Sequence, residues 1–373
     1  MQGASRGTQE RAANSPAESP FAVAGLRIAR ASIGRTCIRT YSLGIVGLGN
    51  VGKAFVALLR DKEQELRNRY GMAWRVTGVA SRRLGWLVAA NGFAPEKLLS
   101  GDFSEAQAAT GVQDWLPSTK ADVLVEVSSL NAATGQPATD YIRAALEAGV
   151  HAISANKGPV VHAWRELTQL AASKNRRFLH ESAMMDGVPI FSLFRETLPA
   201  LELRGFRGVL NSTTTVILEA MEAGKTFDEA VREAQRLGIA ETDPSNDVDG
   251  IDAAVKIVGL TTVLMGGDLK LEDVPRQGIR GIRTEQLNAA QASGEVWKLV
   301  SRARREPDGT ITASVAPERL QVSDPLSTVR GTSLLIGFET DIFPELIIGE
   351  RDPGPQATAY GLLADFITAV RST

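Results

Sequence analysis

Residues 41–52 read Tyr-Ser-Leu-Gly-Ile-Val-Gly-Leu-Gly-Asn-Val-Gly, an apolar run that ends in three spaced glycines. Gly47, Gly49 and Gly52 have the spacing G-x-G-x-x-G, and apolar residues then recur at helical intervals over residues 51–66. This pattern predicts a strand, a tight turn and a helix. The first glycine permits the turn, the second lets a pyrophosphate approach the backbone, and the third lets helix and strand pack closely. The segment therefore predicts a dinucleotide-binding turn, with an ordinary glycine-rich turn as the alternative.

The residues that would contact the dinucleotide follow from the same unit. Asn50 and Val51 open the helix, where free N–H groups and the helix dipole favour phosphate. At the end of the second strand an acidic residue binds the ribose of NAD, whereas an arginine accommodates the additional phosphate of NADP. The predicted second strand, residues 74–80, is followed by Ser-Arg-Arg with no acid. Arg82 therefore favours NADP over NAD, unless the arginines are simply solvated.

Short apolar runs alternate with amphipathic helices from residue 41 to about residue 187. The run at residues 121–127, Ala-Asp-Val-Leu-Val-Glu-Val, is nearly all apolar or small, as expected of a strand buried on both faces. This alternation predicts a doubly wound parallel sheet. The further expected strands are residues 151–154 and 177–180, and the expected helices are residues 141–148 and 160–172.

The pattern changes beyond about residue 187, where helices dominate and β segments are less regular. A second, α+β domain is therefore expected, and 373 residues with 43% apolar content suffice for two cores. The expected boundaries are 41–187 together with 355–373 for the first domain and 188–354 for the second. The elements expected here are a strand at 203–210, helices at 216–223, 227–237, 251–264 and 358–370, and a mixed β segment at 309–350.

Composition excludes several classes of partner. The formal net charge is −2 and 23% of residues are charged, so nothing favours nucleic acid or an anionic membrane as a partner. No apolar run approaches the roughly 18 residues of a membrane span. Cys37 is the single cysteine, which favours a reducing, cytoplasmic compartment. Residues 1–40 lack an apolar period and are interpreted as a disordered extension, with a targeting peptide as the alternative.

The most informative stretch for chemistry is residues 241–256, Glu-Thr-Asp-Pro-Ser-Asn-Asp-Val-Asp-Gly-Ile-Asp-Ala-Ala-Val-Lys. Asp252 and Lys256 are four residues apart and therefore share one face of the predicted helix. Small apolar neighbours favour an acid/base role for the lysine, which the aspartate would hold in place. An exposed Asp–Lys pair, worth only about 0.3–0.5 kcal/mol, is the alternative. A calcium loop is excluded because Ser245 occupies its first acidic position.

A second lysine lies in the segment Ser-Ala-Asn-Lys-Gly at residues 154–158, directly after a short predicted strand. In open α/β sheets, ligands bind beyond the carboxyl ends of the strands. Lys157 could therefore face a cofactor or an anionic substrate group. Taken alone, this position favours an ordinary surface lysine.

Together these stretches resemble the homoserine dehydrogenases, from about Tyr41 to Val370. The likeness implies a Rossmann-type domain followed by a substrate-binding and dimerisation domain, reduction of an aspartate-derived semialdehyde, NADP or NAD as cofactor, and a homodimer. No regulatory or kinase domain of the kinds found in some members is expected. The resembling stretches are the glycine turn, residues 126–129 with 134–137, 154–158, 180–183 with 187–190, and above all 241–256.

The resemblance also implies individual roles. Lys256 matches the family's acid/base lysine and Asp252 the carboxylate that orients it, while Lys157 matches a second lysine near nicotinamide and substrate. Glu241 matches a carboxylate that binds homoserine, and Asp247 would lie nearby. The remaining implied contacts are Ser128 and Ser129 with the cofactor, and a structural sodium ion bound by Glu181 and by backbone carbonyls at Met184, Asp186 and Val188.

Some residues depart from the family pattern. Residues 184–187, Met-Met-Asp-Gly, replace a smaller, glycine-rich segment, which puts the sodium site in doubt. Residues 211–215, Asn-Ser-Thr-Thr-Thr, replace N-G-T-x-N and allow a related amino-acid semialdehyde as substrate. A dinucleotide-binding protein without catalysis is the other alternative. Glu241, Asp252 and Lys256 argue against it, because a pure binding protein needs no acid/base lysine.

Overall fold

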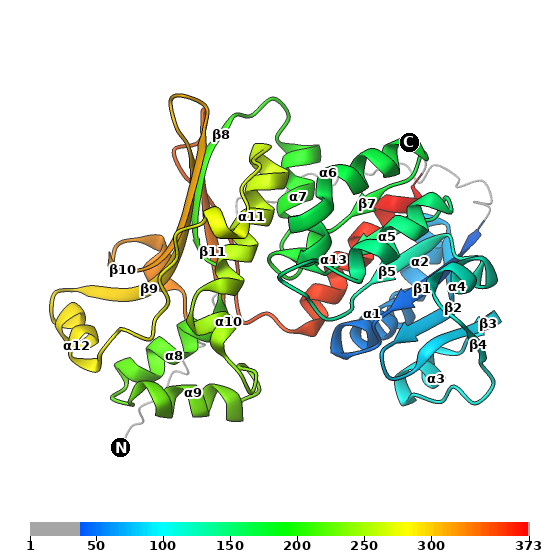
Figure 1. The fold of residues 1–373 in the computed structure, drawn as a ribbon, viewed down its shortest axis with the longest axis horizontal. Helices are drawn as coiled ribbons and strands as arrows, with labels where there is room; N and C mark the ends of the chain where they lie inside the picture. Colours follow the sequence, from blue (N-terminus) through cyan, green and yellow to red (C-terminus); the bar gives the residue numbers. More distant parts are fainter. Residues whose placement is uncertain (1–37, 372–373) are drawn as a thin grey trace, which may run out of the picture. The chain divides into compact units, whose positions relative to one another are not determined.

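The computed structural model describes residues 38–371, and the chain from Ile38 onward forms one compact unit. The predicted N-terminal extension lies outside the described residues, apart from its last three positions. Two sheets organise the described part of the chain (Figure 1). The strands of the first sheet are β1 (Arg39–Val46), β2 (Met72–Ser81), β3 (Gly85–Phe93), β4 (Gln107–Ala109), β5 (Val123–Glu126), β6 (His151–Ser154) and β7 (Phe178–Leu179).

Five strands of the first sheet are parallel, in the order β2-β1-β5-β6-β7. Side chains of β5 alternate between two hydrophobic clusters: Val123 and Val125 face one side of the sheet, and Leu124 faces the other. Both faces are therefore covered, which confirms the predicted doubly wound sheet. β1 begins at Arg39, two residues before the expected start of the folded chain.

The strands β3 and β4 extend this sheet with antiparallel pairing to β2, which the sequence analysis did not predict. Four of the nine residues of β3 are only partly buried and three are exposed, since the strand lies near the edge of the sheet. Its segment Ala-Ala-Asn-Gly interrupts the apolar alternation for the same reason. An edge strand thus gives a weaker sequence pattern than a central one.

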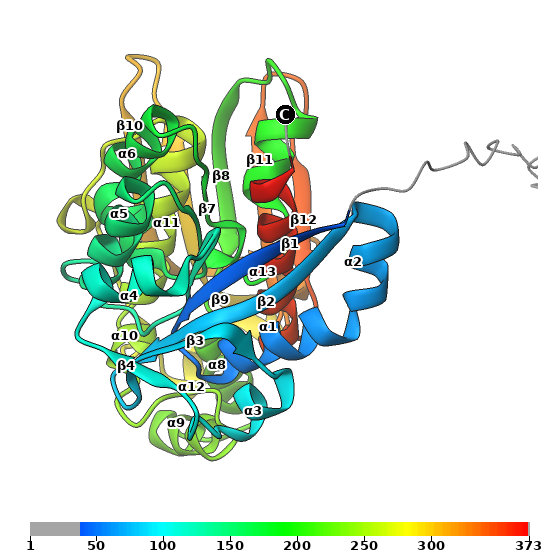
Figure 2. The same ribbon diagram turned by 90° about the vertical axis from the view of Figure 1, so that its right-hand side faces the viewer.

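Helices cover the two faces of the first sheet separately (Figures 1 and 2). Phe55 of α1 and Phe366 of α13 pack on the face that holds Val123, so the C-terminal helix returns to the N-terminal strands. Ile142 of α5 and Leu167 of α6 pack on the opposite face. These helices are α1 (Asn50–Asp61), α2 (Glu63–Tyr70), α3 (Pro95–Ser100), α4 (Val112–Thr119), α5 (Ala138–Glu147), α6 (Lys157–Ser173) and α13 (Pro355–Val370).

The second sheet is antiparallel, in the order β10-β9-β8-β11-β12. Helices α8 and α11 pack on one of its faces. The strand β9 (Glu295–Arg305) lies before the β segment expected at 309–350 and was not predicted. The strands are β8 (Leu203–Val209), β9 (Glu295–Arg305), β10 (Ile311–Gln321), β11 (Leu334–Thr340) and β12 (Leu346–Glu350), and the helices are α7 (Ile190–Ser192), α8 (Ser212–Glu222), α9 (Phe227–Arg236), α10 (Ser245–Val248), α11 (Ile251–Met265) and α12 (Thr284–Ala292).

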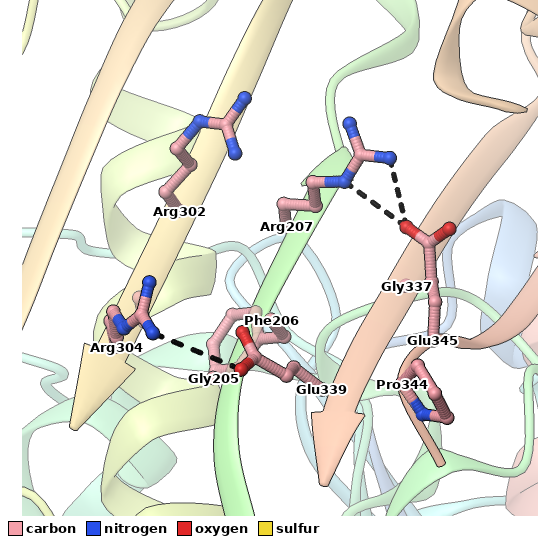
Figure 3. Close-up of a pocket in the computed structure, with 10 residues that line it drawn as sticks. Gly205, Phe206, Arg207, Arg302, Arg304, Gly337, Glu339, Pro344 and Glu345 are labelled. Atoms are coloured by element: carbon pink, nitrogen blue, oxygen red, sulfur yellow. Dashed lines mark hydrogen bonds and ion pairs between the residues drawn. The ribbon is translucent and has the colours of Figure 1, made fainter. Parts of the chain in front are cut away.

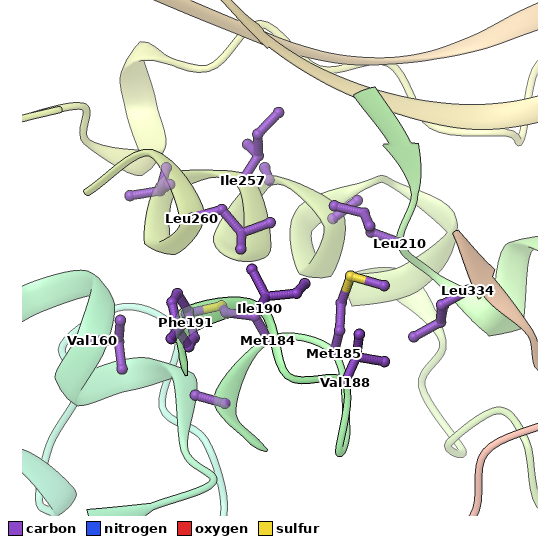
Figure 4. Packing of buried hydrophobic residues seen from close by; sticks show 14 of the residues in the cluster. Val160, Met184, Met185, Val188, Ile190, Phe191, Leu210, Ile257, Leu260 and Leu334 are labelled. Atoms are coloured by element: carbon purple, nitrogen blue, oxygen red, sulfur yellow. The ribbon is translucent and has the colours of Figure 1, made fainter. Parts of the chain in front are cut away.

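The loop that leads from β7 to α7 packs against α11, and this contact places the helix that carries Lys256 (Figure 4). Met184 lies against Gly259 of α11, where an added Cβ would overlap the methionine methyl group. The larger residue of the loop is therefore accommodated by the absence of a side chain on the helix. No helix formed by residues 38–371 is long and apolar enough to cross a membrane.

Candidate active site

The glycine turn joins β1 to α1 as the sequence predicts. Gly47 has φ +103°, and a Cβ there would overlap the Val127 carbonyl oxygen. A Cβ at Gly52 would overlap the carbonyl oxygen of Gly47, so the third glycine permits close packing of helix and turn. Open space surrounds the Cβ position of Gly49, the residue directly before α1. The turn thus leaves its second glycine accessible to a pyrophosphate.

Arg82 follows β2 and is exposed at the same edge of the sheet. One of its terminal nitrogens lies 3.4 Å from Oγ of Ser129, which follows β5. The arginine therefore reaches from the end of the second strand toward the loop after β5. This is the region in which a dinucleotide's adenosine ribose would lie.

A cleft of about 240 Å³ opens beside the start of α1. Val51 of α1 and Ser128 of the loop after β5 line one part of it, and Lys157 and Lys256 line another. Met184 and Asp186, from the loop before α7, also contribute to its wall. The structure thus brings the dinucleotide turn and both predicted lysines to one opening.

The Asp252 carboxylate lies between the two lysines. Its Oδ1 is 3.4 Å from Nζ of Lys157 on α6, and its Oδ2 is 3.2 Å from Nζ of Lys256, one turn further along α11. Lys256 also donates to the carbonyl of Leu210, which fixes its ammonium group. The side chains of Asp252 and Lys256 are only 18% and 12% exposed, so the alternative of an exposed helical pair is wrong.

The charge of Asp252 is stabilised by these neighbours. Desolvation acts to raise the pKa of its carboxyl group, but the ammonium groups of Lys256 and Lys157 oppose it. The cations, aided by hydrogen bonds, prevail and hold the pKa of Asp252 well below its ordinary value of 3.8. Asp252 is therefore a permanent anion that can hold two cations at the cleft.

Asn211 belongs to this cluster, although its role was not predicted from the sequence. Its Oδ1 accepts from the N–H of Thr214 and caps α8, and its Nδ2 donates to Oδ1 of Asp247 at 2.6 Å and to Oδ2 of Asp252 at 3.0 Å. Desolvation raises the pKa of Asp247, and the Asp252 charge adds to this effect. Asn211 is the N-cap of α8, but the helix expected from the sequence began only at residue 216, so its capping position was not recognised.

Glu241 lies in the loop before α10 and is exposed. Gln235 donates to its backbone carbonyl at 3.2 Å. Among the interactions of residues 38–371, no hydrogen bond or ion pair joins the Glu241 carboxylate to Asp252, Lys157 or Lys256. Glu241 therefore does not contact the cluster of Asp252, Lys157 and Lys256, and its part in substrate binding stays a prediction.

Glu181 uses its carboxylate within the protein. Its two oxygens accept from the N–H groups of Phe191 at 2.6 Å and Ser192 at 2.8 Å. Within residues 38–371 no cluster of three or more histidine, cysteine or acidic side chains is suited to a metal ion. Each oxygen of Glu181 thus already accepts one backbone N–H, and the part of Glu181 in a sodium site stays a prediction.

A separate hollow of about 210 Å³ lies on the second sheet, on the face opposite α11 (Figure 3). Ion pairs line it, including Arg207 with Glu345 at 2.9 Å and Arg304 with Glu339 at 3.8 Å. The hollow shares no lining residue with the cleft that holds the two lysines. Its paired charges leave no cluster of unmatched groups that resembles a reaction centre.

Two family models match this chain. The homoserine dehydrogenase model matches residues 189–367, and the homoserine dehydrogenase NAD-binding domain model matches residues 47–181. Similar curated proteins include the NAD(+)-dependent homoserine dehydrogenase of Pseudomonas canavaninivorans, 33% identical over 88% of this chain and 95% of the relative. The homoserine dehydrogenase of Methanocaldococcus jannaschii is 34% identical over 88% of this chain and 98% of the relative.

Solved structures give the same result. A putative homoserine dehydrogenase from Archaeoglobus fulgidus has a TM-score of 0.78 and 29% identity, covering 88% of this chain and 98% of its own. A hyperthermophilic archaeal homoserine dehydrogenase in complex with NADPH has a TM-score of 0.75 and 30% identity, covering 89% and 98%. With the dinucleotide turn and the two sheets, these matches show that the chain belongs to the homoserine dehydrogenase family, NAD(P)-dependent oxidoreductases that act on a CH–OH group.

Proposed function

We propose that Lys256, Asp252 and Lys157 form the active site in which the chain interconverts L-homoserine and L-aspartate 4-semialdehyde, with NADP preferred over NAD. The observation that carries this proposal is the Asp252 carboxylate, held between two lysine ammonium groups at a cleft that begins at the dinucleotide turn. A purely structural ion cluster would have no reason to face that cleft.

The bound nicotinamide supplies or accepts the hydride. In the reducing direction Lys256 donates a proton to the substrate oxygen as negative charge develops there. The carbonyl of Leu210 and the carboxylate of Asp252 hold its ammonium group in one position. Lys157, held by the other oxygen of Asp252, adds a second positive charge at the cleft. Much of the chain's contribution is therefore the positioning of charges around the reacting oxygen.

We assign Glu241 and Asp247 to recognition of the substrate's amino group. A carboxylate is the natural partner of an ammonium group, and Asp247 is joined to Asp252 through the side chain of Asn211. Glu241 lies on the exposed loop before α10, from which it could contact a bound substrate. Glu241→Gln should raise the KM for homoserine by about tenfold while kcat changes less, as expected for loss of a charge-assisted contact.

Arg82 supports the preference for NADP, since the end of β2 carries no acidic residue. Among relatives, the Pseudomonas canavaninivorans enzyme is named NAD(+)-dependent and the archaeal structure is a complex with NADPH. In Arg82→Ala the KM for NADP+ should rise by about tenfold, the cost of one charge-assisted hydrogen bond to phosphate. The KM for NAD+ is the internal control and should not change.

The proposal includes a homodimer that forms through the face of the second sheet opposite α11. It also includes two domains, with the boundaries 41–187 together with 355–373 and 188–354. Ile347 on β12 is 40% exposed, and Ile342 and Phe343 in the preceding turn are 66% and 38% exposed. Apolar side chains beside charged pairs are typical of an interface.

The single cysteine and the small substrate favour the cytoplasm. A sodium ion held by Glu181 and by backbone carbonyls of Met184, Asp186 and Val188 should make activity depend on Na+.

The test is the initial rate of homoserine oxidation, followed by the absorbance of the reduced nicotinamide, with NADP+ and NAD+ supplied separately. The wild type should turn over homoserine, and Lys256→Ala should lose about 10²–10⁴-fold in kcat, the usual contribution of an acid/base residue. Lys256→Ala with nearly wild-type kcat would overturn the assignment. Faster turnover of another amino-acid alcohol would overturn the assignment of homoserine as the substrate.

A further inference from the structure

A second buried carboxylate lies beneath the same cleft and has no role in the proposed chemistry. Glu126 is the last residue of β5 and is fully buried. Its Oε1 accepts from the N–H of Ser128 at 2.9 Å and from the hydroxyl of the same serine, and its Oε2 accepts from Oγ of Ser154 at 3.0 Å. Within residues 38–371 no cationic side chain forms an ion pair with it.

The contacts of Glu126 continue into the start of α6. Oγ of Ser154 accepts from the N–H of Asn156 at 3.0 Å, and Nδ2 of Asn156 donates to the Ser128 carbonyl at 3.2 Å. The same asparagine caps α6, because its Oδ1 accepts from the N–H of Gly158 at 3.0 Å. Glu126, Ser128, Asn156 and Ser154 thus form a closed ring of hydrogen bonds.

This ring joins two segments that line the cleft. One is the loop after β5, from which Val127 and Ser128 face the cleft. The other is the first turn of α6, whose first helical residue is Lys157. Lys157 lies 3.4 Å from Asp252, so the placement of α6 decides where its ammonium group meets the catalytic carboxylate. If one segment shifted relative to the other, the loop after β5 would move away from the Lys157 ammonium group.

Packing alone does not account for a glutamate here. A carboxylate buried without a cation costs free energy, whereas an apolar residue of similar size fills such a space without that cost. Desolvation accordingly raises the pKa of Glu126, and the hydrogen bonds from Ser128, Ser154 and Asn156 offset this only in part. The distinctive contribution of the carboxylate is a pair of acceptor oxygens that reach two segments at once.

We infer that Glu126 is a positioning residue for the dehydrogenase reaction: it fixes the loop of Val127–Ser129 to the start of α6 and thereby places the Lys157 ammonium group against Asp252. The inference rests on the proposed roles of Ser128 and Lys157 in the active site. Glu126 itself is fully buried and does not line the cleft, so it acts through Ser128 and through the start of α6.

The test compares Glu126→Gln with Asp122→Asn. Asp122 directly precedes the same strand and accepts from the N–H of Ser42 at 2.8 Å, so it controls for loss of a hydrogen-bonded carboxylate. In Glu126→Gln, kcat at saturating substrates should fall by about tenfold, because misplacement of a catalytic group is costly. The KM for homoserine should change by less than about threefold, as for loss of an interaction made in the transition state. Asp122→Asn should keep kcat.

A double-mutant cycle separates positioning of Lys157 from general loosening. If Glu126 acts through Lys157, then Glu126→Gln should reduce kcat by less than about twofold in a Lys157→Ala background. Equal reductions in both backgrounds would overturn the inference, as would a wild-type kcat in Glu126→Gln. Either result could occur while the wild type turns over homoserine and Lys256→Ala does not, which would leave the proposed function intact.

Ser154→Ala provides the same test should Glu126→Gln fail to fold. It removes the arm of the ring that leads to α6 but keeps the carboxylate and its contacts with Ser128. Its kcat should fall by about threefold or more, again with little further loss in the Lys157→Ala background. A Ser154→Ala enzyme with unchanged kcat, or with equal loss in both backgrounds, would contradict the inference.

Discussion

Asp252, which is mostly buried, and Glu126, which is fully buried, are two carboxylates close to one cleft, and their surroundings shift their pKa values in opposite directions. Desolvation acts to raise both, but Asp252 lies between Lys157 and Lys256 and its pKa is lowered. Glu126 is surrounded by hydroxyl and amide donors, and its pKa is raised. Neutral donors thus offset the cost of burying a charge only in part, whereas two cations reverse its effect on the pKa. Asp252 thus binds two ammonium groups, whereas Glu126 fixes the positions of two chain segments.

Of the two carboxylates, Asp252 should have the larger effect when its charge is removed, because both lysines then lack their anionic partner. Asp252→Asn should lower kcat by about 10²-fold, at the low end for an acid/base system. It should also lower the free energy of unfolding by about 3 kcal/mol, as when one partner of a buried pair is removed. Urea unfolding and initial rates measure the two effects.

The control is Asp249→Asn, three residues earlier in the chain. Asp249 pairs with Arg280 at 2.5 Å, but its side chain is 40% exposed. Loss of an exposed pair should cost less than about 1 kcal/mol and leave kcat unchanged. If the free energy of unfolding fell by similar amounts in the two variants, the ion pairs of Asp252 would contribute no more to stability than an exposed pair does.

The pH dependence of stability should distinguish the two carboxylates by its sign. The pKa of Asp252 is lowered on folding, so its contribution to stability is present above about pH 4 and disappears as the pH falls further. The pKa of Glu126 is raised above 4.5, so its ionisation destabilises the fold at neutral pH, and this penalty disappears as the pH falls through the raised pKa.

These signs can be measured as differences between wild type and variant. From pH 7 to pH 5 the free energy of unfolding of the wild type should improve relative to Glu126→Gln and stay constant relative to Asp252→Asn. Below about pH 4 the advantage of the wild type over Asp252→Asn should shrink. Parallel changes in both differences would show that the surroundings of the two carboxylates do not act as described.

Asn211 should have a smaller effect than Asp252, since it supports Asp252 without carrying charge. Asn211→Ser keeps an oxygen that can cap α8 but removes the donor to Asp247 and Asp252. It should lower kcat by about tenfold, the value of one charge-assisted hydrogen bond. Asn211→Ala should show a similar kcat and a further loss of about 1 kcal/mol in unfolding free energy, since the cap is also lost. Equal stability of both variants would remove the capping role.

Much of the fold follows from the sequence because its central elements obey simple periods. The glycine turn, the buried strand around Val125 and the helix of Lys256 were predicted close to their observed bounds. The strand β9 was missed because Lys298 and Arg302 interrupt its apolar pattern. Lys298 is nevertheless buried, and its ammonium group donates to the Val329 carbonyl at 2.6 Å. Desolvation lowers its pKa to about 8.

The site was less predictable where roles depend on contacts between distant segments. Asp252 and Lys256 share a helix, so their spacing alone places them together, but Lys157 joins them only through the packing of α6 on α11. Asn211 and Glu126 were not predicted as site residues, since neither carries a local pattern that reveals its partners. Such hydrogen-bond networks appear only when the fold is known.

In the proposed reaction, Lys256, held by Asp252, supplies the proton at the reacting oxygen. Its most direct test is the single-turnover rate of semialdehyde reduction by enzyme saturated with reduced nicotinamide, in wild type and Lys256→Ala, with the dissociation constant of the cofactor measured in parallel. The rate should fall by about 10²–10⁴-fold while the dissociation constant changes little. A Lys256→Ala enzyme that reduces the semialdehyde at nearly the wild-type rate would contradict the account.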